Sequence, residues 1–214
     1  MISTIIFDLD GLLADTEKLH RSAYQEVFDN LGVELSSEEY EDHWIRRGEG
    51  IDAFVEKRNL AIDPRLIRRM KAERYEEMVR SGVEPMPGAR EVLNLLKDRK
   101  PLALATSSYP KDAYAVLDVI GFMDFFSCVV TKGNVERIKP YPDIFLHVAD
   151  EMNAPPERCL VIEDAEKGIL AADAAGMKSI AVPNEHTKSN DFSKATLVLN
   201  SLEEIDCELI DRLK

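Results

Sequence analysis

The sequence lacks the features that mark exported, membrane-bound or nucleic-acid-binding proteins. No run approaches the roughly 20 apolar residues of a helical membrane span, and no basic segment with a cleavage site opens the chain. Only 27 basic residues stand against 40 acidic ones, and the resulting formal net charge of −13 disfavours contact with a phosphate backbone. We therefore expect a soluble, unexported cytoplasmic protein that binds neither a membrane nor nucleic acid.

Cysteine is also scarce in this chain. The three cysteines, Cys128, Cys159 and Cys207, are widely spaced and form no CxxC or Cys/His pattern. This usage is typical of reduced thiols and argues against a disulfide framework, a zinc site or a redox role. With 45% hydrophobic residues among 214, the chain is long enough for one substantial core, with or without an inserted unit.

Short apolar runs alternate with helical patterns along most of the sequence. The expected strands are Thr4–Phe7, Leu102–Ala105, Cys128–Val130, Leu160–Ile162, Ser179–Val182 and Leu197–Leu199. The expected helices between them are Ala89–Lys97, Lys111–Ile120, Asp143–Met152 and Ala165–Ala175. Most of the strands are apolar throughout, as parallel strands covered on both faces should be. The alternation predicts a doubly wound, Rossmann-like α/β fold with a parallel sheet.

One interval departs from this alternation. Residues 15–83 contain helical patterns and no convincing strand, over a length too great for a strand crossover. Two prolines and a glycine in 85–88 indicate where the interval ends. We therefore predict an inserted all-helical cap at 15–85 and an α/β core formed by 1–14 and 86–214.

Polar residues cluster after the expected strands. In chain order they are Asp8, Asp10, Thr106, Ser107, Ser108, Glu163 and Asp164. Parallel strands present functional groups at their carboxyl ends, so we expect these side chains at one edge of the sheet. Pro140 disfavours helix for the residue before it and so keeps Lys139 extended or in a turn. Clustered carboxylates repel one another unless a hard cation joins them, which predicts bound Mg²⁺ and an anionic substrate.

Each of these residues has a simpler explanation when it is taken alone. Asp164 could cap the following helix, Thr106 could be an ordinary turn residue, and Lys139 could be a solvated charge. Asp8 and Asp10 could belong to a surface turn. However, a surface turn rarely follows a continuous apolar strand, and a second carboxylate pair follows a later strand. The joint pattern therefore favours a site.

Four motifs occur in a characteristic order along the chain. They are FDLDG at 7–11, the strand-end Thr106 in LALATSS, Lys139 in KPYPDIF, and VIEDAEKG at 161–168. This ordered set resembles that of the haloacid dehalogenase superfamily of phosphotransferases, and with the helical insert the resemblance spans essentially the whole chain. Within that superfamily, the sequence is most similar to the subgroup that holds small-metabolite phosphatases and β-phosphoglucomutase.

The resemblance implies roles for the residues that match. Asp8 would be the nucleophile that becomes an aspartyl phosphate, and Asp10 would be the general acid and then the base. Thr106 and the backbone amide of Ser107 would hold phosphoryl oxygens, while Lys139 would neutralise the charge around them. The implied Mg²⁺ ligands are Asp8, the carbonyl oxygen of Asp10, Asp164 and, as a further candidate, Glu163.

Residues that would contact substrate are implied in both predicted units. In the core they are Gly11, Ser107 and Ser108, and in the cap they are His20, Arg47 and Lys71. By the same register, Ile51 stands where the mutase has an arginine that grips the second phosphate of its intermediate. Without an arginine that holds this phosphate through two hydrogen bonds, the phosphoryl group should be transferred to water, although Arg46 or Arg47 could substitute for that arginine. The expected function is a Mg²⁺-dependent phosphatase of a small phosphorylated metabolite such as a sugar or polyol phosphate; a β-phosphoglucomutase-type mutase is the alternative.

A non-catalytic phospho-acceptor domain is a further alternative. Receiver domains share an acidic pair, a strand-end Thr or Ser and a Lys-Pro, but their acceptor lies on the third strand and they have no cap. Here the third expected strand ends Val130–Thr131–Lys132, without an acidic residue. This difference favours the enzyme. A monomer is the default expectation, because the sequence shows no evident interface pattern.

Overall fold

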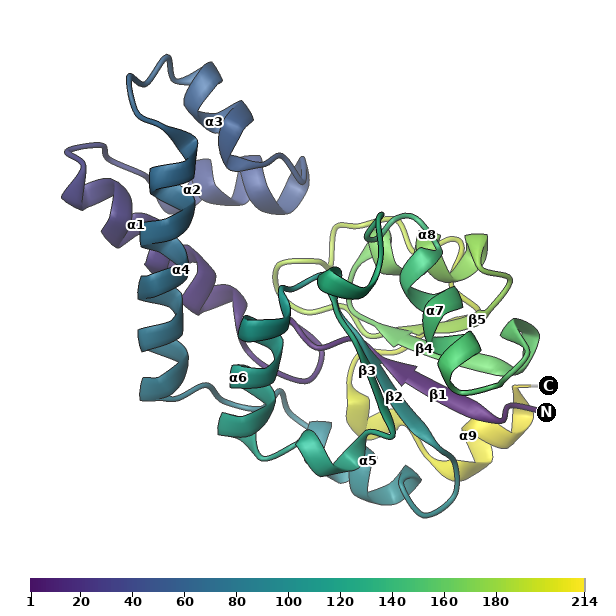
Figure 1. Cartoon of the computed structure of the whole chain (residues 1–214). Coiled ribbons are helices and arrows are strands. Elements are labelled where there is room, and N and C mark those ends of the chain that lie inside the picture. Colours follow the sequence, from purple (N-terminus) through teal and green to yellow (C-terminus); the bar gives the residue numbers. More distant parts are fainter. Residues whose placement is uncertain (214) are drawn as a thin grey trace. The chain divides into compact units, whose positions relative to one another are not determined.

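A computed structural model describes residues 1–213, and the chain divides into two compact units (Figure 1). One unit combines Met1–Asp15 with the chain from Glu84 onward, and the other is Thr16–Val83. We call them the α/β unit and the helical unit. Among the described residues, no helix is both long and apolar enough to serve as a membrane span.

The α/β unit is built on a six-stranded parallel sheet with the order β3-β2-β1-β4-β5-β6. The strands are β1 (Thr4–Phe7), β2 (Leu102–Ala105), β3 (Cys128–Val130), β4 (Cys159–Glu163), β5 (Lys178–Ala181) and β6 (Leu197–Val198). This sheet confirms the predicted doubly wound α/β fold. The chain runs from β1 outward to β3 and then returns to the other side of β1, so the strand order reverses between β1 and β4. Such a reversal point is where open α/β sheets bind ligands.

The later strands differ from their predicted bounds by one residue at one or both ends. β4 was expected at Leu160–Ile162, but Glu163 pairs with Ala181 and so extends the ladder. The same pairing places β5 at Lys178–Ala181 instead of Ser179–Val182. Apolar character marks which residues are buried, whereas the hydrogen-bonded ladder decides where a strand begins and ends, and the two need not coincide.

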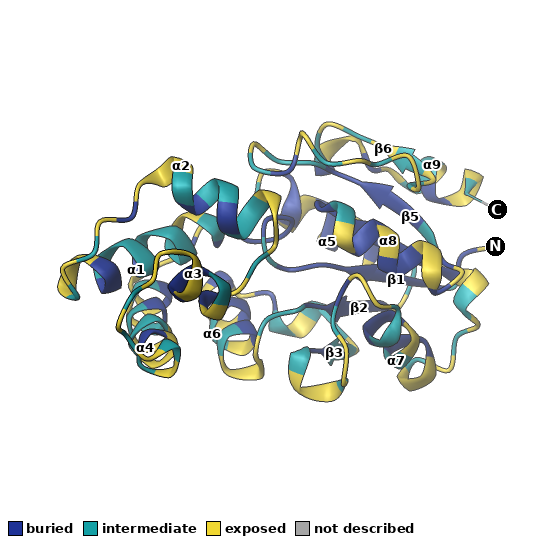
Figure 2. Cartoon of the chain, turned by 90° about the horizontal axis from the view of Figure 1, so that it is seen from above, coloured by how far each residue is buried: buried dark blue, intermediate teal, exposed yellow. Residues whose placement is uncertain are grey.

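Helices cover both faces of the sheet. They are α5 (Ala89–Leu96), α6 (Pro110–Ile120), α7 (Asp143–Glu151), α8 (Glu166–Ala174) and α9 (Cys207–Arg212), and 3₁₀ turns occur at Met123–Phe125, Lys132–Asn134, Pro156–Arg158 and Leu202–Glu204. α7 and α8 pack their apolar side chains, such as Phe145 and Ala172, against one face around Ile6 and Val161. Figure 2 shows the central strands buried and each of these helices exposing one side. The loops that follow the strand ends are therefore supported by a sheet packed between helices.

The helical unit confirms the predicted all-helical insert. Its elements are α1 (Glu17–Asn30), α2 (Ser37–Tyr40), a π-helix at Glu41–Arg46, α3 (Ile51–Lys57) and α4 (Pro64–Ser81). Asp63 caps α4 by accepting a hydrogen bond from the backbone N–H of Arg65, and Pro64 begins the helix. A core of its own forms around the rings of Phe28 and Phe54, whose centroids are 5.0 Å apart.

Candidate active site

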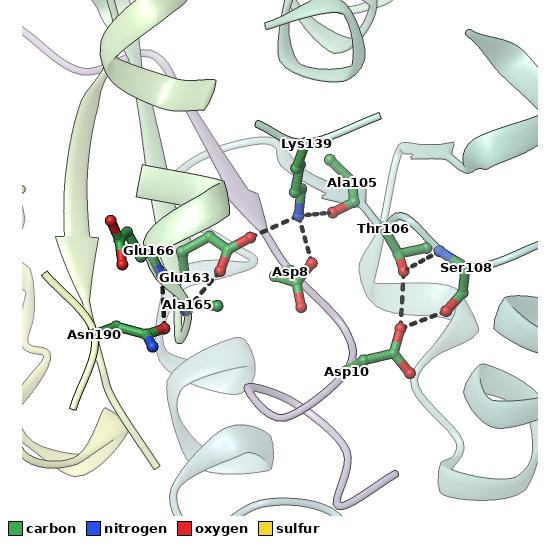
Figure 3. A network of polar contacts seen from close by, with 10 residues as sticks. All are labelled: Asp8, Asp10, Ala105, Thr106, Ser108, Lys139, Glu163, Ala165, Glu166 and Asn190. Atoms are coloured by element: carbon green, nitrogen blue, oxygen red, sulfur yellow. Dashed lines mark hydrogen bonds and ion pairs between the residues drawn. The ribbon is translucent and has the colours of Figure 1, made fainter. Parts of the chain in front are cut away.

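Asp8 lies at the carboxyl end of β1, beside the reversal point of the sheet (Figure 3). Its backbone N–H donates to the carbonyl oxygen of Ile162, so the β1–β4 ladder continues one residue beyond Phe7 and fixes the backbone of Asp8. Only 6% of the residue is exposed. Asp8 is therefore a carboxylate held by a central strand in largely buried surroundings.

Lys139 is the cation that joins this carboxylate to the next strand. Its Nζ donates to Asp8 Oδ1, to Glu163 Oε1 at 2.7 Å and to the carbonyl oxygen of Ala105 at 2.8 Å. The three protons of an ammonium group thus have three acceptors. Burial alone would lower the pKa of Lys139, but Asp8 and Glu163 raise it above its ordinary value. Lys139 is therefore charged, and it ties β1, β2 and β4 together (Figure 3).

The site nevertheless holds more negative than positive charge. Asp8, Glu163 and Asp164 are all buried, and an oxygen of each lies within 4.8 Å of the others. Burial raises the pKa of Asp8 to about 7, although Lys139 opposes the shift. Burial, Glu163 and Asp8 likewise raise the pKa of Asp164 well above its ordinary value. An all-oxygen set of crowded carboxylates is the donor chemistry that a hard divalent cation prefers, so these residues fit a metal site.

Glu163 has a different set of contacts from the two aspartates. Its Oε1 accepts from Lys139, and its Oε2 accepts from the backbone N–H of Ala165 at 3.0 Å. The side chain runs against the backbone of Gly168 in α8, where an added Cβ would lie 1.8 Å from Oε1. Glu163 thus holds both the lysine and the start of α8, and the absence of a side chain at position 168 makes room for it.

Asp10 belongs to a second polar network, which joins it to residues that follow β2 (Figure 3). Its Oδ2 accepts from the hydroxyls of Thr106 at 2.9 Å and Ser108 at 2.7 Å. The backbone N–H of Ser108 donates in turn to Thr106 Oγ1 at 3.0 Å. Ser107 contributes a buried hydroxyl with no hydrogen-bond partner within residues 1–213. The strand-end residues after β1 and β2 thus lie together, as the pattern of strand ends predicts.

Gly11 and Asp164 meet a residue that the sequence reasoning did not single out. Asn184, in the loop after β5, donates from Nδ2 to Asp164 Oδ2 at 2.8 Å and to the carbonyl oxygen of Gly11 at 3.0 Å. Gly11 has φ +81°, and a Cβ there would lie 2.6 Å from Asp164 Oδ2. The sequence places Asn184 in VPNEHT, shortly after a strand end, and this position could have indicated a site residue. However, β5 itself contains no acidic residue that would have drawn attention to the loop.

The remaining predicted residues lie in the helical unit. Lys71 Nζ is 2.6 Å from His20 Nδ1 and 4.3 Å from the centroid of Tyr75, whose ring stacks on His20 at 4.1 Å. An ammonium group only donates, so His20 Nδ1 is the acceptor in this contact. Arg47 forms an ion pair with Asp42 at 2.7 Å. The structure therefore brings His20 and Lys71 together and engages Arg47 separately.

Comparison with known proteins supports one family. The family model described as "Haloacid dehalogenase-like hydrolase" matches residues 5–182. The fructose-1-phosphate phosphatase YqaB of Escherichia coli (strain K12) is 35% identical over 184 residues, which cover 83% of this chain and 95% of the relative.

Two solved structures are similar over nearly their whole length. CbbY from Rhodobacter sphaeroides in complex with phosphate has a TM-score of 0.84 and 29% identity, with 95% of this chain and 96% of that one covered. A β-phosphoglucomutase from Clostridium difficile has a TM-score of 0.83 and 28% identity, with 100% and 97% covered.

The contact between Glu163 and Gly168 predicts a sharp cost for a single methyl group. In Gly168→Ala the new Cβ overlaps the Glu163 carboxyl group, which cannot move without loosening its bond to Lys139. We expect a loss of about 3 kcal/mol in the free energy of unfolding, measured by urea denaturation.

The matched control is Gly176→Ala, at the end of the same helix. Gly176 has φ +71°, and within residues 1–213 no atom outside its chain neighbours lies within 4 Å of an added Cβ, so only backbone strain of about 1 kcal/mol is expected. Equal losses in the two variants would contradict the packing role of Gly168.

Proposed function

Because the chain belongs to the haloacid dehalogenase-like hydrolase family and is a phosphatase, we propose that it hydrolyses sugar or polyol phosphates with Mg²⁺ through an aspartyl phosphate on Asp8. The observation that carries this proposal is the placement of Asp8. It stands at the carboxyl end of the central strand, paired with Lys139 and close to Asp164. A nucleophile that attacks phosphorus has to be ionised next to positive charge, and the lysine supplies part of that charge.

Positioning and electrostatics account for most of the chemistry of phosphoryl transfer, because the transferring group spreads its charge over three oxygens. Asp8 attacks phosphorus, and the bond to the leaving alcohol breaks; water then attacks the phosphorus of the aspartyl phosphate, which breaks its bond to Asp8 and releases inorganic phosphate. Thr106 and the backbone amide of Ser107 hold the phosphoryl oxygens, and Lys139 neutralises charge on them. The buried hydroxyl of Ser107 has no hydrogen-bond partner among the described residues, which supports placing a polar ligand at this strand end.

Asp10 is the proposed acid and base of the reaction. It protonates the oxygen of the leaving alcohol and later takes a proton from the attacking water, so one side chain serves both half-reactions. The bonds from Thr106 and Ser108 to Oδ2 hold its carboxyl group on the same strand edge as Asp8. This shared position supports the assignment.

Asp8, Asp164 and the backbone carbonyl of Asp10 are the proposed holders of Mg²⁺. When bound, the ion supplies the positive charge that the three buried carboxylates lack, and it stabilises negative charge on the phosphoryl oxygens. Both oxygens of Glu163 already accept hydrogen bonds, which supports a role in holding Lys139 instead of direct ligation.

The helical unit contributes the proposed substrate contacts His20, Arg47 and Lys71. Ile51, which stands where the mutase has its clamping arginine, is 3% exposed and packs in the apolar core of this unit. Arg46 and Arg47 each form an ion pair with Asp42, at 3.6 and 2.7 Å. These contacts favour hydrolysis over phosphoryl return to the sugar. The similarity to β-phosphoglucomutase keeps the mutase as the second candidate.

Replacing the proposed nucleophile should abolish turnover. We expect Asp8→Asn to lower kcat on a generic aryl phosphate by about 10³-fold or more, because an amide cannot form the covalent intermediate. Asp98→Asn, an exposed change after α5, is the control and should keep wild-type activity. An Asp8→Asn protein within tenfold of wild type would refute the assignment.

Mg²⁺ should stabilise the protein more at high pH than at low pH. Burial raises the pKa of Asp8 from 3.8 to about 7, so between these values the folded chain keeps a proton that the unfolded chain has lost. The contribution of Asp8 to stability therefore falls as pH rises through this window. Mg²⁺ replaces that proton, and its binding improves as the carboxyl group ionises.

Thermal unfolding with and without Mg²⁺ near pH 5 and near pH 8 measures this linkage. The expected rise in Tm on adding Mg²⁺ is larger near pH 8, and Asp8→Asn should reduce the difference between the two conditions. Equal rises at both pH values in the wild-type protein would contradict the prediction.

A substrate panel separates hydrolysis from isomerisation. With Mg²⁺, we expect free phosphate from sugar and polyol phosphates including fructose 1-phosphate. From β-glucose 1-phosphate we expect free phosphate and no glucose 6-phosphate, because Ile51 offers no guanidinium to retain a second phosphate. Each reaction is repeated with Asp8→Asn as the enzyme blank. Glucose 6-phosphate as the main product would establish the mutase instead.

A further inference from the structure

Asn184 joins three loops at the carboxyl edge of the sheet. Its Nδ2 lies 2.8 Å from Asp164 Oδ2, in the segment after β4, and 3.0 Å from the carbonyl oxygen of Gly11, in the turn after β1. Gly11 and Asp164 themselves are so close that a Cβ on Gly11 would lie 2.6 Å from Asp164 Oδ2 and 2.8 Å from Asn184 Nδ2. The amide therefore fills a space in which no further side chain fits.

The orientation of the Asn184 amide follows from its other contacts. Oδ1 accepts from the backbone N–H groups of His186 at 2.8 Å and Thr187 at 3.2 Å. The backbone N–H of Asn184 donates to the hydroxyl of Thr187 at 3.0 Å, which closes the turn. Because two donors point at one end of the amide, that end has to be the oxygen, and the NH₂ group has to face Asp164.

The chemical nature of this contact suits a metal-binding carboxylate. A lysine in place of Asn184 would compete with a cation for Asp164, and a carboxylate would repel it. A neutral amide donor fixes the rotation of the carboxyl group while it leaves the negative charge uncompensated. It engages one lone pair of Oδ2 and leaves the carboxylate further lone pairs for a cation shared with Asp8.

We propose that Asn184 is a positioning residue that holds the Asp164 carboxylate in the orientation required for Mg²⁺. This inference rests on the proposed metal-dependent function. Asn184 touches neither substrate nor metal; it acts through Asp164 and ties that residue to the Gly11 turn, which follows the nucleophile by three positions. Outer partners of metal ligands contribute about 10–100-fold to metal affinity in other proteins.

The test measures Mg²⁺ affinity by isothermal titration calorimetry without substrate. Asn184→Ala removes the amide, whereas Asn184→Ser removes the donor to Asp164 but leaves a hydroxyl that can accept from the same turn. We expect both variants to bind Mg²⁺ about 10-fold or more weakly. In activity assays, the Mg²⁺ concentration for half-maximal rate should rise similarly, and kcat at saturating Mg²⁺ should recover.

Thr187→Val is the matched control. It removes the hydroxyl that accepts from the Asn184 backbone and leaves the amide in place, so it should lower Tm modestly and keep the wild-type Mg²⁺ affinity. If Thr187→Val weakens Mg²⁺ binding as much as Asn184→Ala, the effect comes from the loop and the proposal is wrong. Wild-type Mg²⁺ affinity in both Asn184 variants would also overturn it.

The outcome also separates this inference from the proposed function. If the wild-type protein binds Mg²⁺ and Asp164→Asn does not, the metal site stands whatever the Asn184 variants show. If the wild-type protein binds no Mg²⁺, the metal-dependent function fails, and the role of Asn184 fails with it.

Discussion

The buried ammonium group of Lys139 is the interaction on which the rest of the site depends. A charge in the protein interior is tolerated only when it is paired and fully hydrogen-bonded, and Lys139 meets both conditions through Asp8, Glu163 and the carbonyl oxygen of Ala105. These acceptors come from β1, β4 and β2, which are neighbours in the sheet. The lysine therefore links the functional strand ends that the sheet holds side by side, and it leaves a surplus of negative charge that a divalent cation can balance.

The proposed function assigns chemistry to one unit and recognition to the other. The groups proposed for bond breaking all stand on the α/β unit, where strand ends and a dense apolar layer limit their movement. The groups proposed for substrate choice stand on helices with their own aromatic core. Under this proposal, an isoleucine in place of an arginine at position 51 alters the outcome of the reaction without disturbing the nucleophile. Such a division would account for the similarity of this chain to both a phosphatase and a mutase.

Much of the fold and the centre of the site could be predicted from the sequence, because both have local signals. Continuous apolar runs locate β1 and β2 to the residue, and FDLDG identifies Asp8 and Asp10 without knowledge of any distant contact. For Asn184 the sequence offers only its place after a strand end, since its partner Gly11 lies 173 positions away. The contacts of Glu163 likewise could not be predicted, because they depend on Lys139, which is distant in the sequence, and on Gly168 in the next helix.

The hydroxyl group of Thr106 carries a consequence for the order of events. It has a single proton, which in this structure goes to Asp10. If the same hydroxyl holds a phosphoryl oxygen, as proposed, the two anions compete for one donor, and an arriving phosphate displaces the carboxyl group. With a phosphate ester bound, Asp10 would then lose the hydrogen bond from Thr106 but keep the one from Ser108. Arrival of the ester would in this way leave the carboxyl group of Asp10 with one hydroxyl donor fewer, just when it is needed for proton transfer.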